Sequence, residues 1–157
     1  MKKIVDEIRL NYIYNAKKRN AHYSFDGIKY MNGGEFAECL DKYIRGFAPV
    51  KDANTPFDVD SDIPELGISV KSQNCGLTDR RLADNFDDYV KLFFKYVHSK
   101  YFDWVVINDN IVTIYAMNKK EFKTFVKKFC RWDSYSMKPK FGLNTLGMIA
   151  WLELHCA

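Results

Sequence analysis

Two neighbouring runs of alternating side chains constrain the fold of this chain more than any other feature. Residues 56–63 carry aspartate at every second position, and residues 66–73 alternate apolar and polar side chains. Successive side chains of a strand point to opposite faces of a sheet, so this alternation predicts two strands. A tight turn at Pro64-Glu65 would join the two strands as a β-hairpin.

One face of each run is polar, and the two polar faces would coincide in such a hairpin. Their members are Asp58, Asp60, Asp62, Ser69, Lys71 and Gln73. A two-residue turn places Asp60 opposite Ser69 and Asp58 opposite Lys71. Three carboxylates and an ammonium group would then meet on a sheet surface, where they can hold a divalent metal beside a phosphate.

A solvated outer face is the alternative interpretation of the same pattern. Hairpins commonly expose one polar face, and a lone Asp–Lys pair on a surface is usually a weak salt bridge. Three acids on one strand face repel each other, however, and aspartate is depleted from strands. Such a face needs a cation or basic groups over it, and the hairpin alone leaves both interpretations open.

Length and composition predict one globular domain over residues 1–157. Apolar residues make up 47% of the chain and aromatic residues 16%, which excludes wholesale disorder. A net charge of +4 permits an anionic partner without requiring one. The four cysteines are scattered without a CxxC pair, which argues against structural zinc and favours reduced thiols in a cytoplasmic protein. No long apolar run or signal peptide is visible, so no membrane association is expected.

Periodicity and turn signals predict an alternation of helices and strands. We expect helices over residues 3–19, 35–45, 78–98 and 118–132, and a helix in preference to a strand over 145–155. We expect irregular structure or a short strand pair near 22–30, a short strand near 47–51, a second hairpin over 102–117 and an edge strand over 138–143. The expected helix caps are Thr78, Asn118 with Glu121, and Asn144 or Thr145. This order predicts an α/β fold with three layers, α/β/α, around a mixed sheet of four to five strands.

The chain resembles the PD-(D/E)XK nuclease superfamily, whose restriction-endonuclease-like core runs α-β-β-β-α-β, over roughly residues 33–107. The matching segments are Gly34-Glu35-Phe36-Ala37-Glu38 at the start of a helix, Asp62 (or Asp58 or Asp60) in one strand, and Ser69-Val70-Lys71 in the next. Gln73 matches a polar position frequent in recombination-type and Holliday-junction-type members. The resemblance implies a nuclease-like core at 33–117, an N-terminal helical extension at 1–32 and C-terminal helical additions at 118–157.

Ser69 departs from the family pattern, which has a metal-binding Glu or Asp two residues before the lysine. A hydroxyl brings no charge and is a poorer Mg²⁺ ligand than a carboxylate. Some members of the family move the missing acid to another element, a role that Asp58 or Asp60 would fill here. Other members have lost catalysis and only bind their partner, and both outcomes remain open.

The resemblance implies a metal-dependent mechanism for an active site of this kind. Mg²⁺ (or Mn²⁺) would be held by Asp62 with Asp60, Asp58 or Ser69, and would activate a water molecule. Lys71 would orient that water or stabilise the developing charge, with Gln73 beside it. Glu35 or Glu38 would add a second metal ligand, although acids at a helix start also simply favour the helix dipole.

Two basic segments are candidate nucleic-acid contacts. Lys17, Lys18 and Arg19 lie close in sequence to Tyr23, and bases stack on such rings. The alternative for this first segment is simple helix termination. Lys123 and Lys127 lie on a basic helix face, which is most often just solvated, so the N-terminal segment is the better candidate. We expect a small endonucleolytic DNA nuclease, and the sequence is compatible with a homodimer. The alternative is an inactive nuclease fold that binds nucleic acid or protein in a mobile element or a defence or counter-defence system, and a protein-binding inhibitor is a third class.

Overall fold

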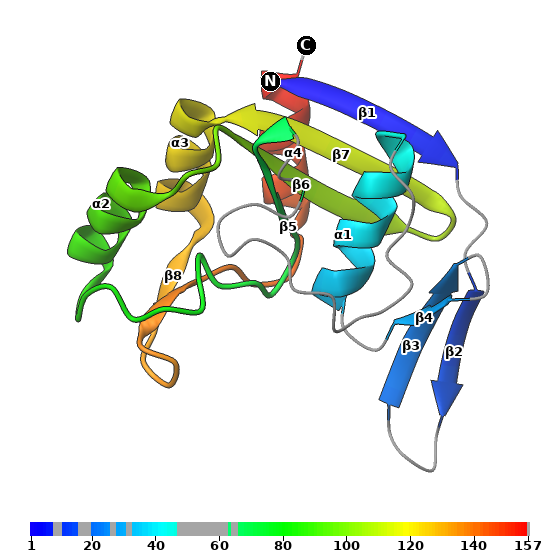
Figure 1. Cartoon of the computed structure of the whole chain (residues 1–157), viewed down its shortest axis with the longest axis horizontal. Helices are drawn as coiled ribbons and strands as arrows, with labels where there is room; N and C mark the ends of the chain where they lie inside the picture. Colours follow the sequence, from blue (N-terminus) through cyan, green and yellow to red (C-terminus); the bar gives the residue numbers. More distant parts are fainter. Residues whose placement is uncertain are drawn as a thin grey trace.

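A four-stranded mixed sheet lies at the centre of the structure (Figure 1). The computed structural model describes residues 1–7, 11–15, 20–25, 28–30, 33–46, 63 and 66–156, with the backbone alone at 11–30, Gly33 and Glu35. The strands lie in the order β1 (Lys2–Glu7), β7 (Ile111–Asn118), β6 (Tyr101–Asn108) and β5 (Ile68–Lys71). β5 runs parallel to β6, and the other neighbouring pairs are antiparallel.

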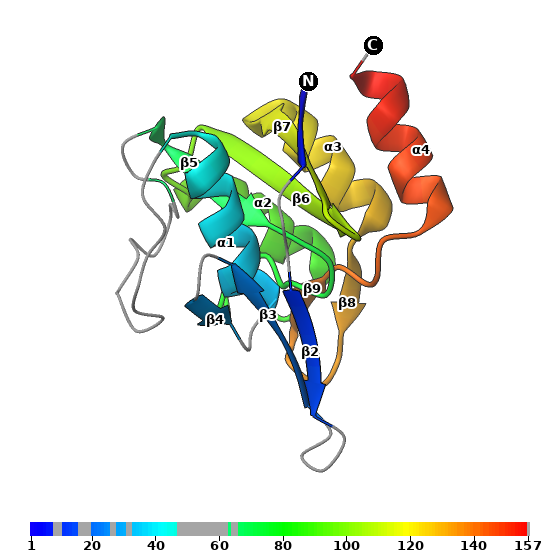
Figure 2. The same cartoon turned by 90° about the vertical axis from the view of Figure 1, so that its right-hand side faces the viewer.

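Helices cover both faces of this sheet. Helix α1 (Gly33–Ile44) packs on one face, and α2 (Phe86–Tyr96), α3 (Lys119–Phe129) and α4 (Leu146–His155) contribute to the core on the other. Figure 2 shows α1 on one side of the sheet and α3 and α4 on the other. Within the described part of the chain, these helices are all too short or too polar to cross a membrane. The predicted α/β class with a mixed four-stranded sheet is therefore confirmed, and the arrangement is compatible with three layers.

Side-chain alternation along β6 divides the core in two. Phe102 and Trp104 pack with α2, α3 and α4, whereas Val105 packs with α1. Phe102 stacks on Phe122 of α3 at a ring-centroid distance of 4.2 Å. Helices α3 and α4, in the segment expected as C-terminal helical additions, share this core with the sheet.

The expected N-terminal helix over residues 3–19 is wrong. β1 pairs with β7 from Lys2↔Ala116 to Glu7↔Ile111, and residues Asn11–Asn15 form strand β2. The Ile and Val residues of this segment suit a strand, and a partner more than 100 residues away decides the outcome over the local helical spacing. The helical extension expected at 1–32 is therefore wrong over the described residues of this segment, because β1 belongs to the central sheet.

Two smaller sheets complete the described structure. β2, β3 (Asn20–Phe25) and β4 (Ile28–Tyr30) form an antiparallel sheet, which confirms the strand pair expected near 22–30. β8 (Arg131–Asp133) and β9 (Lys138–Lys140) form a hairpin, so a strand does lie within the expected range of 138–143. Helix α3 ends at Phe129 rather than 132 because β8 begins at Arg131.

Local capping signals predicted most helix starts correctly. Asn118 and Glu121 form the expected capping box, with hydrogen bonds of 2.8 and 3.0 Å, and Thr145 caps α4. The second hairpin is also confirmed, with Asn108 paired to Ile111. Helix α2 does not begin after Thr78, because Asn85 caps it by accepting a hydrogen bond of 2.9 Å from the amide of Asp88.

The first hairpin is confirmed only in its second strand, and its turn is longer than expected. Ile63 forms an antiparallel bridge with Ile68, which leaves four residues between them instead of two. Gly67 has a φ of +65°, a conformation that favours glycine, and the amide of Leu66 donates to the carbonyl of Ile63. The pairing at Ile63 therefore differs from that of the predicted two-residue turn. Asp58, Asp60 and Asp62, whose pairing with Ser69 and Lys71 was predicted, and the strand expected at 47–51 lie outside the described residues.

The alternation along β1 gives a direct test of its place in the sheet. Ile4 is half-buried against the core on the α1 face, whereas the neighbouring Val5 is 56% exposed. We expect Ile4→Ala to lower the free energy of unfolding by about 1–2 kcal/mol and Val5→Ala by less than about 0.5 kcal/mol. Urea denaturation measures both values, and equal losses would contradict the strand assignment.

Candidate active site

A cavity of about 770 Å³ lies at the β5 edge of the described sheet. Its walls come from the start of α1, strand β5, the loop at residues 72–82 and the end of α2. Three of the residues singled out in the sequence line it together: Glu38, Ser69 and Lys71. The cavity therefore joins two elements of the predicted site, the helix and the second strand of the hairpin.

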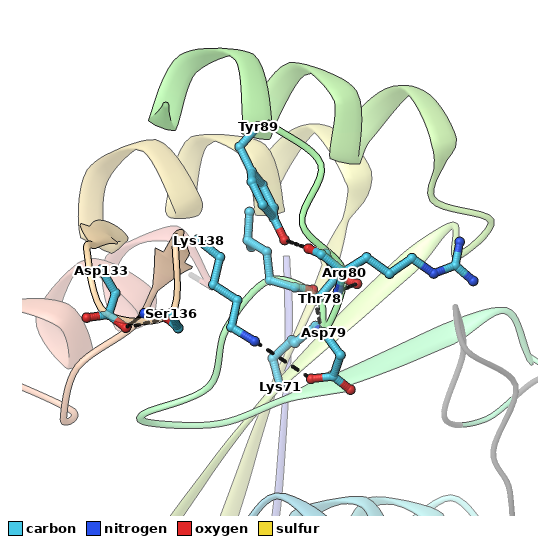
Figure 3. Close-up of polar contacts among 9 residues, drawn as sticks. Lys71, Thr78, Asp79, Arg80, Tyr89, Asp133, Ser136 and Lys138 are labelled. Carbon is cyan, nitrogen blue, oxygen red and sulfur yellow. Dashed lines mark hydrogen bonds and ion pairs between the residues drawn. The ribbon is translucent and has the colours of Figure 1, made fainter. Parts of the chain in front are cut away.

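Lys71 is the last residue of β5 and is half-buried in this cavity. Its Nζ donates a hydrogen bond of 3.1 Å to the carbonyl of Leu77. The amide of Leu77 in turn donates to the carbonyl of Pro139 at 3.2 Å, so the lysine and the loop are tied to β9. Figure 3 shows Lys71 beneath the loop that carries Thr78, Asp79 and Arg80. An ammonium group held in this way occupies a defined position at the cavity.

Ser69 is buried and already engaged in a hydrogen bond. Its hydroxyl lies 2.6 Å from the hydroxyl of Ser99, which precedes β6 and is also buried. Ile68 and Val70 pack with α1, so β5 has the predicted alternation of polar and apolar faces. The contact with Ser99 joins β5 to the start of its parallel neighbour, which gives Ser69 a structural role whether or not it binds a metal.

The structure distinguishes among the other predicted catalytic residues. Glu38 is half-buried and lines the cavity, whereas the side chain of Glu35 lies outside the description. Gln73 is exposed, and its Oε1 accepts a hydrogen bond of 3.2 Å from the amide of Asn144. Asn144 Oδ1 accepts a hydrogen bond of 3.0 Å from Trp104 Nε1, so Gln73 helps to fasten the segment before α4. Gln73 does not line the cavity.

The loop at residues 78–81 brings charged groups that the sequence interpretation missed. Asp79 and Arg80 line the cavity, and Asp79 lies 3.9 Å from the ammonium group of Lys138 (Figure 3). The hydroxyl of Tyr89 donates to the carbonyl of Arg80 and anchors the loop to α2. Burial raises the pKa of Tyr89 to about 12, so this donor keeps its proton. The charged run after Thr78 is the sequence signal for this loop, although the helix expected at 78–98 includes these residues.

No cluster of three or more acidic, histidine or cysteine side chains suited to a metal occurs in the described portion of the chain. Glu38 and Asp79 are the described carboxylates at the cavity, and oxygen ligands of this kind suit Mg²⁺. The three aspartates of the first hairpin strand lie outside the description. The metal site at this edge consequently stays a prediction.

The predicted nucleic-acid contacts fall in different environments. Lys17, Lys18 and Arg19 lie outside the described residues, and for Tyr23 only the backbone in β3 is described. Lys127 is exposed on α3. Lys123 is half-buried, with its ammonium group 5.8 Å from the ring centroid of Phe94, a cation–π contact. Lys123 therefore packs on α2 and is not fully exposed to solvent.

A buried cluster of charged residues lies on the other face of the sheet. Arg45 Nε donates to Asp41 Oδ1 at 2.9 Å and to Asp103 Oδ2 at 2.8 Å, and its Nη2 donates to Asp103 Oδ1 at 3.0 Å. Both aspartates are fully buried. The cluster links α1, which carries Glu38, to β6, the neighbour of β5. The i,i+4 spacing of Asp41 and Arg45, and an aspartate inside the apolar β6 segment, were the sequence signals for it.

One carboxyl group of this cluster keeps its proton. Burial, followed by the proximity of Asp103, raises the pKa of Asp41 from 3.8 to about 9, against the lowering effect of Arg45. A single guanidinium cannot neutralise two buried carboxylates, so one proton is retained. Oδ2 of Asp41 has no hydrogen-bond partner within the described structure, so the ionised form of this carboxyl group lacks one of the contacts that would stabilise its charge.

The retained proton makes stability depend on pH in a defined direction. Between about pH 4 and pH 9 the folded protein holds a proton on Asp41 that the unfolded chain has released. The free energy of unfolding therefore decreases as pH rises through this range. Asn at position 41 keeps the shape without titrating. We expect the free energy of unfolding to fall with pH by at most about 1.4 kcal/mol per unit in the parent, and to be flatter in Asp41→Asn.

Urea denaturation at pH 5, 7 and 9 measures this difference. Asp87→Asn, an exposed position in the first turn of α2, is the matched control and keeps the parental slope. An Asp41→Asn variant whose stability varies with pH as steeply as that of the parent would show that Asp41 is ionised in the folded state.

Comparison of the chain with protein-family models, with curated proteins and with solved structures finds no match. The features available for a functional assignment are thus those of the cavity itself. They are Lys71 at the end of β5, Glu38 from the adjacent helix α1, and the charged loop that carries Asp79 and Arg80 in the same cavity wall.

Proposed function

We propose that this chain is a small divalent-metal-dependent DNA nuclease of the PD-(D/E)XK type, with its active site at the β5 edge. The observation that carries the proposal is the meeting of Lys71 and Glu38 in one cavity of about 770 Å³. They come from two elements that the family motif combines, a helix and an adjacent strand. The cavity is large enough for a nucleotide-sized group of the substrate.

The order of elements supports a restriction-endonuclease-like core. Helix α1 is followed by the bridge at Ile63, by β5, by the crossover helix α2 and by β6, which runs parallel to β5. This succession corresponds to the family order α-β-β-β-α-β except for its first strand. Residues 47–62, between α1 and the bridge, lie outside the described residues.

The family motif has its first metal-binding aspartate just before the strand that carries the lysine. Asp62 directly precedes Ile63 in the sequence, and the bridge partner of Ile63, Ile68, directly precedes Ser69. We therefore assign Asp62 as the first metal ligand. The second carboxylate would come from Glu38, Asp60 or Asp58, because the hydroxyl of Ser69 is engaged with Ser99.

The residues of the chain have distinct roles in this proposal. A bound Mg²⁺ or Mn²⁺ would polarise the phosphodiester and supply a nucleophilic hydroxide. Lys71, held by the carbonyl of Leu77, stabilises the negative charge that develops on the phosphate oxygens. Glu38 accepts a proton or orients the attacking water from the helix side. The loop at 72–82 forms the wall of the cavity next to Lys71.

A second candidate function is nucleic-acid binding without catalysis. The observation that favours it is the buried hydrogen bond between Ser69 and Ser99, at a position where the family places a metal-binding acid. A serine fixed in the interior brings no charge to a metal. The two candidates differ in one respect, which is whether a metal ion promotes cleavage.

Cleavage assays with a Lys71 variant test the nuclease proposal. We expect Mg²⁺ or Mn²⁺ to support cleavage of DNA, and Lys71→Ala to reduce the rate at least about 100-fold, because a charge-stabilising donor is lost. Lys91→Ala, an exposed lysine on α2, is the matched control and should cleave like the parent. Equal melting temperatures of the variants would show that folding is intact. No cleavage of single-stranded, duplex or branched DNA by the parent would leave the binding function as the supported one.

Thermal stabilisation by metal tests the proposed ligand separately from activity. A metal bound only by the folded state raises the melting temperature, so millimolar Mg²⁺ or Mn²⁺ should stabilise the parent. We expect Asp62→Asn to remove most of this shift and Glu65→Gln, three residues along the chain, to retain it. Equal shifts in the two variants would indicate that Asp62 is merely a solvated surface residue.

A further inference from the structure

The β8–β9 hairpin presents an aromatic ring to solvent beside the cavity. Tyr135 lies in the four-residue turn between the two strands and is 95% exposed. The other aromatic residue of the hairpin, Trp132, is half-buried and contacts Tyr89 edge-on at a ring-centroid distance of 6.1 Å. The hairpin is thus anchored at its base by one ring and exposes another at its tip.

Hydrogen bonds hold the tip in a fixed conformation. The carboxylate of Asp133 accepts from both the amide and the hydroxyl of Ser136, which lowers the pKa of Asp133 (Figure 3). Met137, with a φ of +54°, completes the turn. A ring presented by a preorganised turn loses little conformational entropy when it binds a partner.

The hairpin is a continuation of the cavity wall. The amide of Phe141 donates to the carbonyl of Cys75 at 2.8 Å, Gly76 forms a bridge with Lys140, and the amide of Leu77 donates to Pro139. Cys75, Gly76 and Leu77 all line the cavity, and Leu77 also holds Lys71. A ligand bound to the hairpin would therefore lie on an element that is hydrogen-bonded to the wall of the proposed active site.

Positive charge surrounds this hairpin. Residues 127–140 contain five basic side chains and one acid, Asp133, whose carboxylate is bonded to Ser136. Lys128, Arg131 and Lys140 are exposed, as is Arg80 on the adjoining loop. The positive charge complements a polyanion, and the exposed ring of Tyr135 can stack on flat groups such as unpaired bases.

We propose that the β8–β9 hairpin is a binding element for an unpaired nucleic-acid strand, in which Tyr135 stacks on a base and the surrounding lysines and arginines contact its phosphates. The inference rests on the proposed function and specifies its substrate as DNA with a single-stranded part. Exposed aromatic rings within basic surfaces bind single strands without sequence preference, because every base has a face that can stack. A fully paired duplex keeps its bases stacked internally and gains only the phosphate contacts.

Binding in the presence of EDTA tests the inference apart from catalysis. Fluorescence anisotropy would compare a labelled mixed-sequence single strand with its duplex. We expect Tyr135→Ala to weaken binding of the single strand roughly 5- to 100-fold and to leave duplex binding nearly unchanged, whereas Tyr135→Trp retains affinity. Leu146→Ala is the matched control, since Leu146 is 91% exposed but lies on α4. Lys140→Ala should lower the salt dependence of binding by about one phosphate contact.

The outcomes separate this inference from the nuclease proposal. Parental single-strand affinity in Tyr135→Ala, in a protein that cleaves DNA with metal, would overturn the hairpin assignment alone. Selective loss of single-strand binding in Tyr135→Ala, in a protein that never cleaves, would support the hairpin and overturn the nuclease. A parent that binds neither single strand nor duplex at low salt would overturn both.

Discussion

The buried contact of Arg45 with Asp41 and Asp103 fixes the helix of the proposed site to its sheet. Burial of three ionisable groups is costly unless each is hydrogen-bonded, so this geometry tolerates little displacement of α1 relative to β6. Because β5 is the parallel neighbour of β6, the contact also sets the position of α1 relative to Lys71. Glu38 lies three residues before Asp41 on the same helix, so the contact also fixes where Glu38 lies relative to the sheet. The contact of Arg45 with the two aspartates thus joins α1, which carries Glu38, to β6.

A second set of contacts orders the opposite side of the cavity. The carbonyl of Leu77 holds Lys71, and the amide of Leu77 binds Pro139, which places the hairpin of β8 and β9 at the same wall. The proposed reaction centre and the proposed strand-binding element are therefore consecutive parts of one hydrogen-bonded path. Backbone hydrogen bonds hold the two close together. Substitution of the side chains of Lys138 or Lys140 should therefore leave this arrangement in place.

Local signals in the sequence predicted local structure well. The capping box of Asn118, the alternation of β5 and the turn at Asn108 each depend on residues only a few positions apart, and all were correct. Strand β1 could not be predicted in this way, because its partner β7 lies more than 100 residues away. The bridge of Ile63 with Ile68 likewise depends on the conformation of Gly67, which the alternation does not encode. Of the candidate site, Lys71 and Glu38 were predicted, whereas the loop at Asp79 was not, because an apolar stripe there resembled a helix.

The proposed function depends on a divalent metal that binds beside Lys71 at the β5 edge. A crystal structure with Mn²⁺, analysed by anomalous scattering, tests this binding because the ion is located independently of activity. We expect a peak inside the cavity, bonded to the carboxylate of Asp62 and to a second carboxylate, with the ammonium group of Lys71 nearby. An empty cavity at saturating Mn²⁺, or an ion bound only elsewhere on the surface, would contradict it.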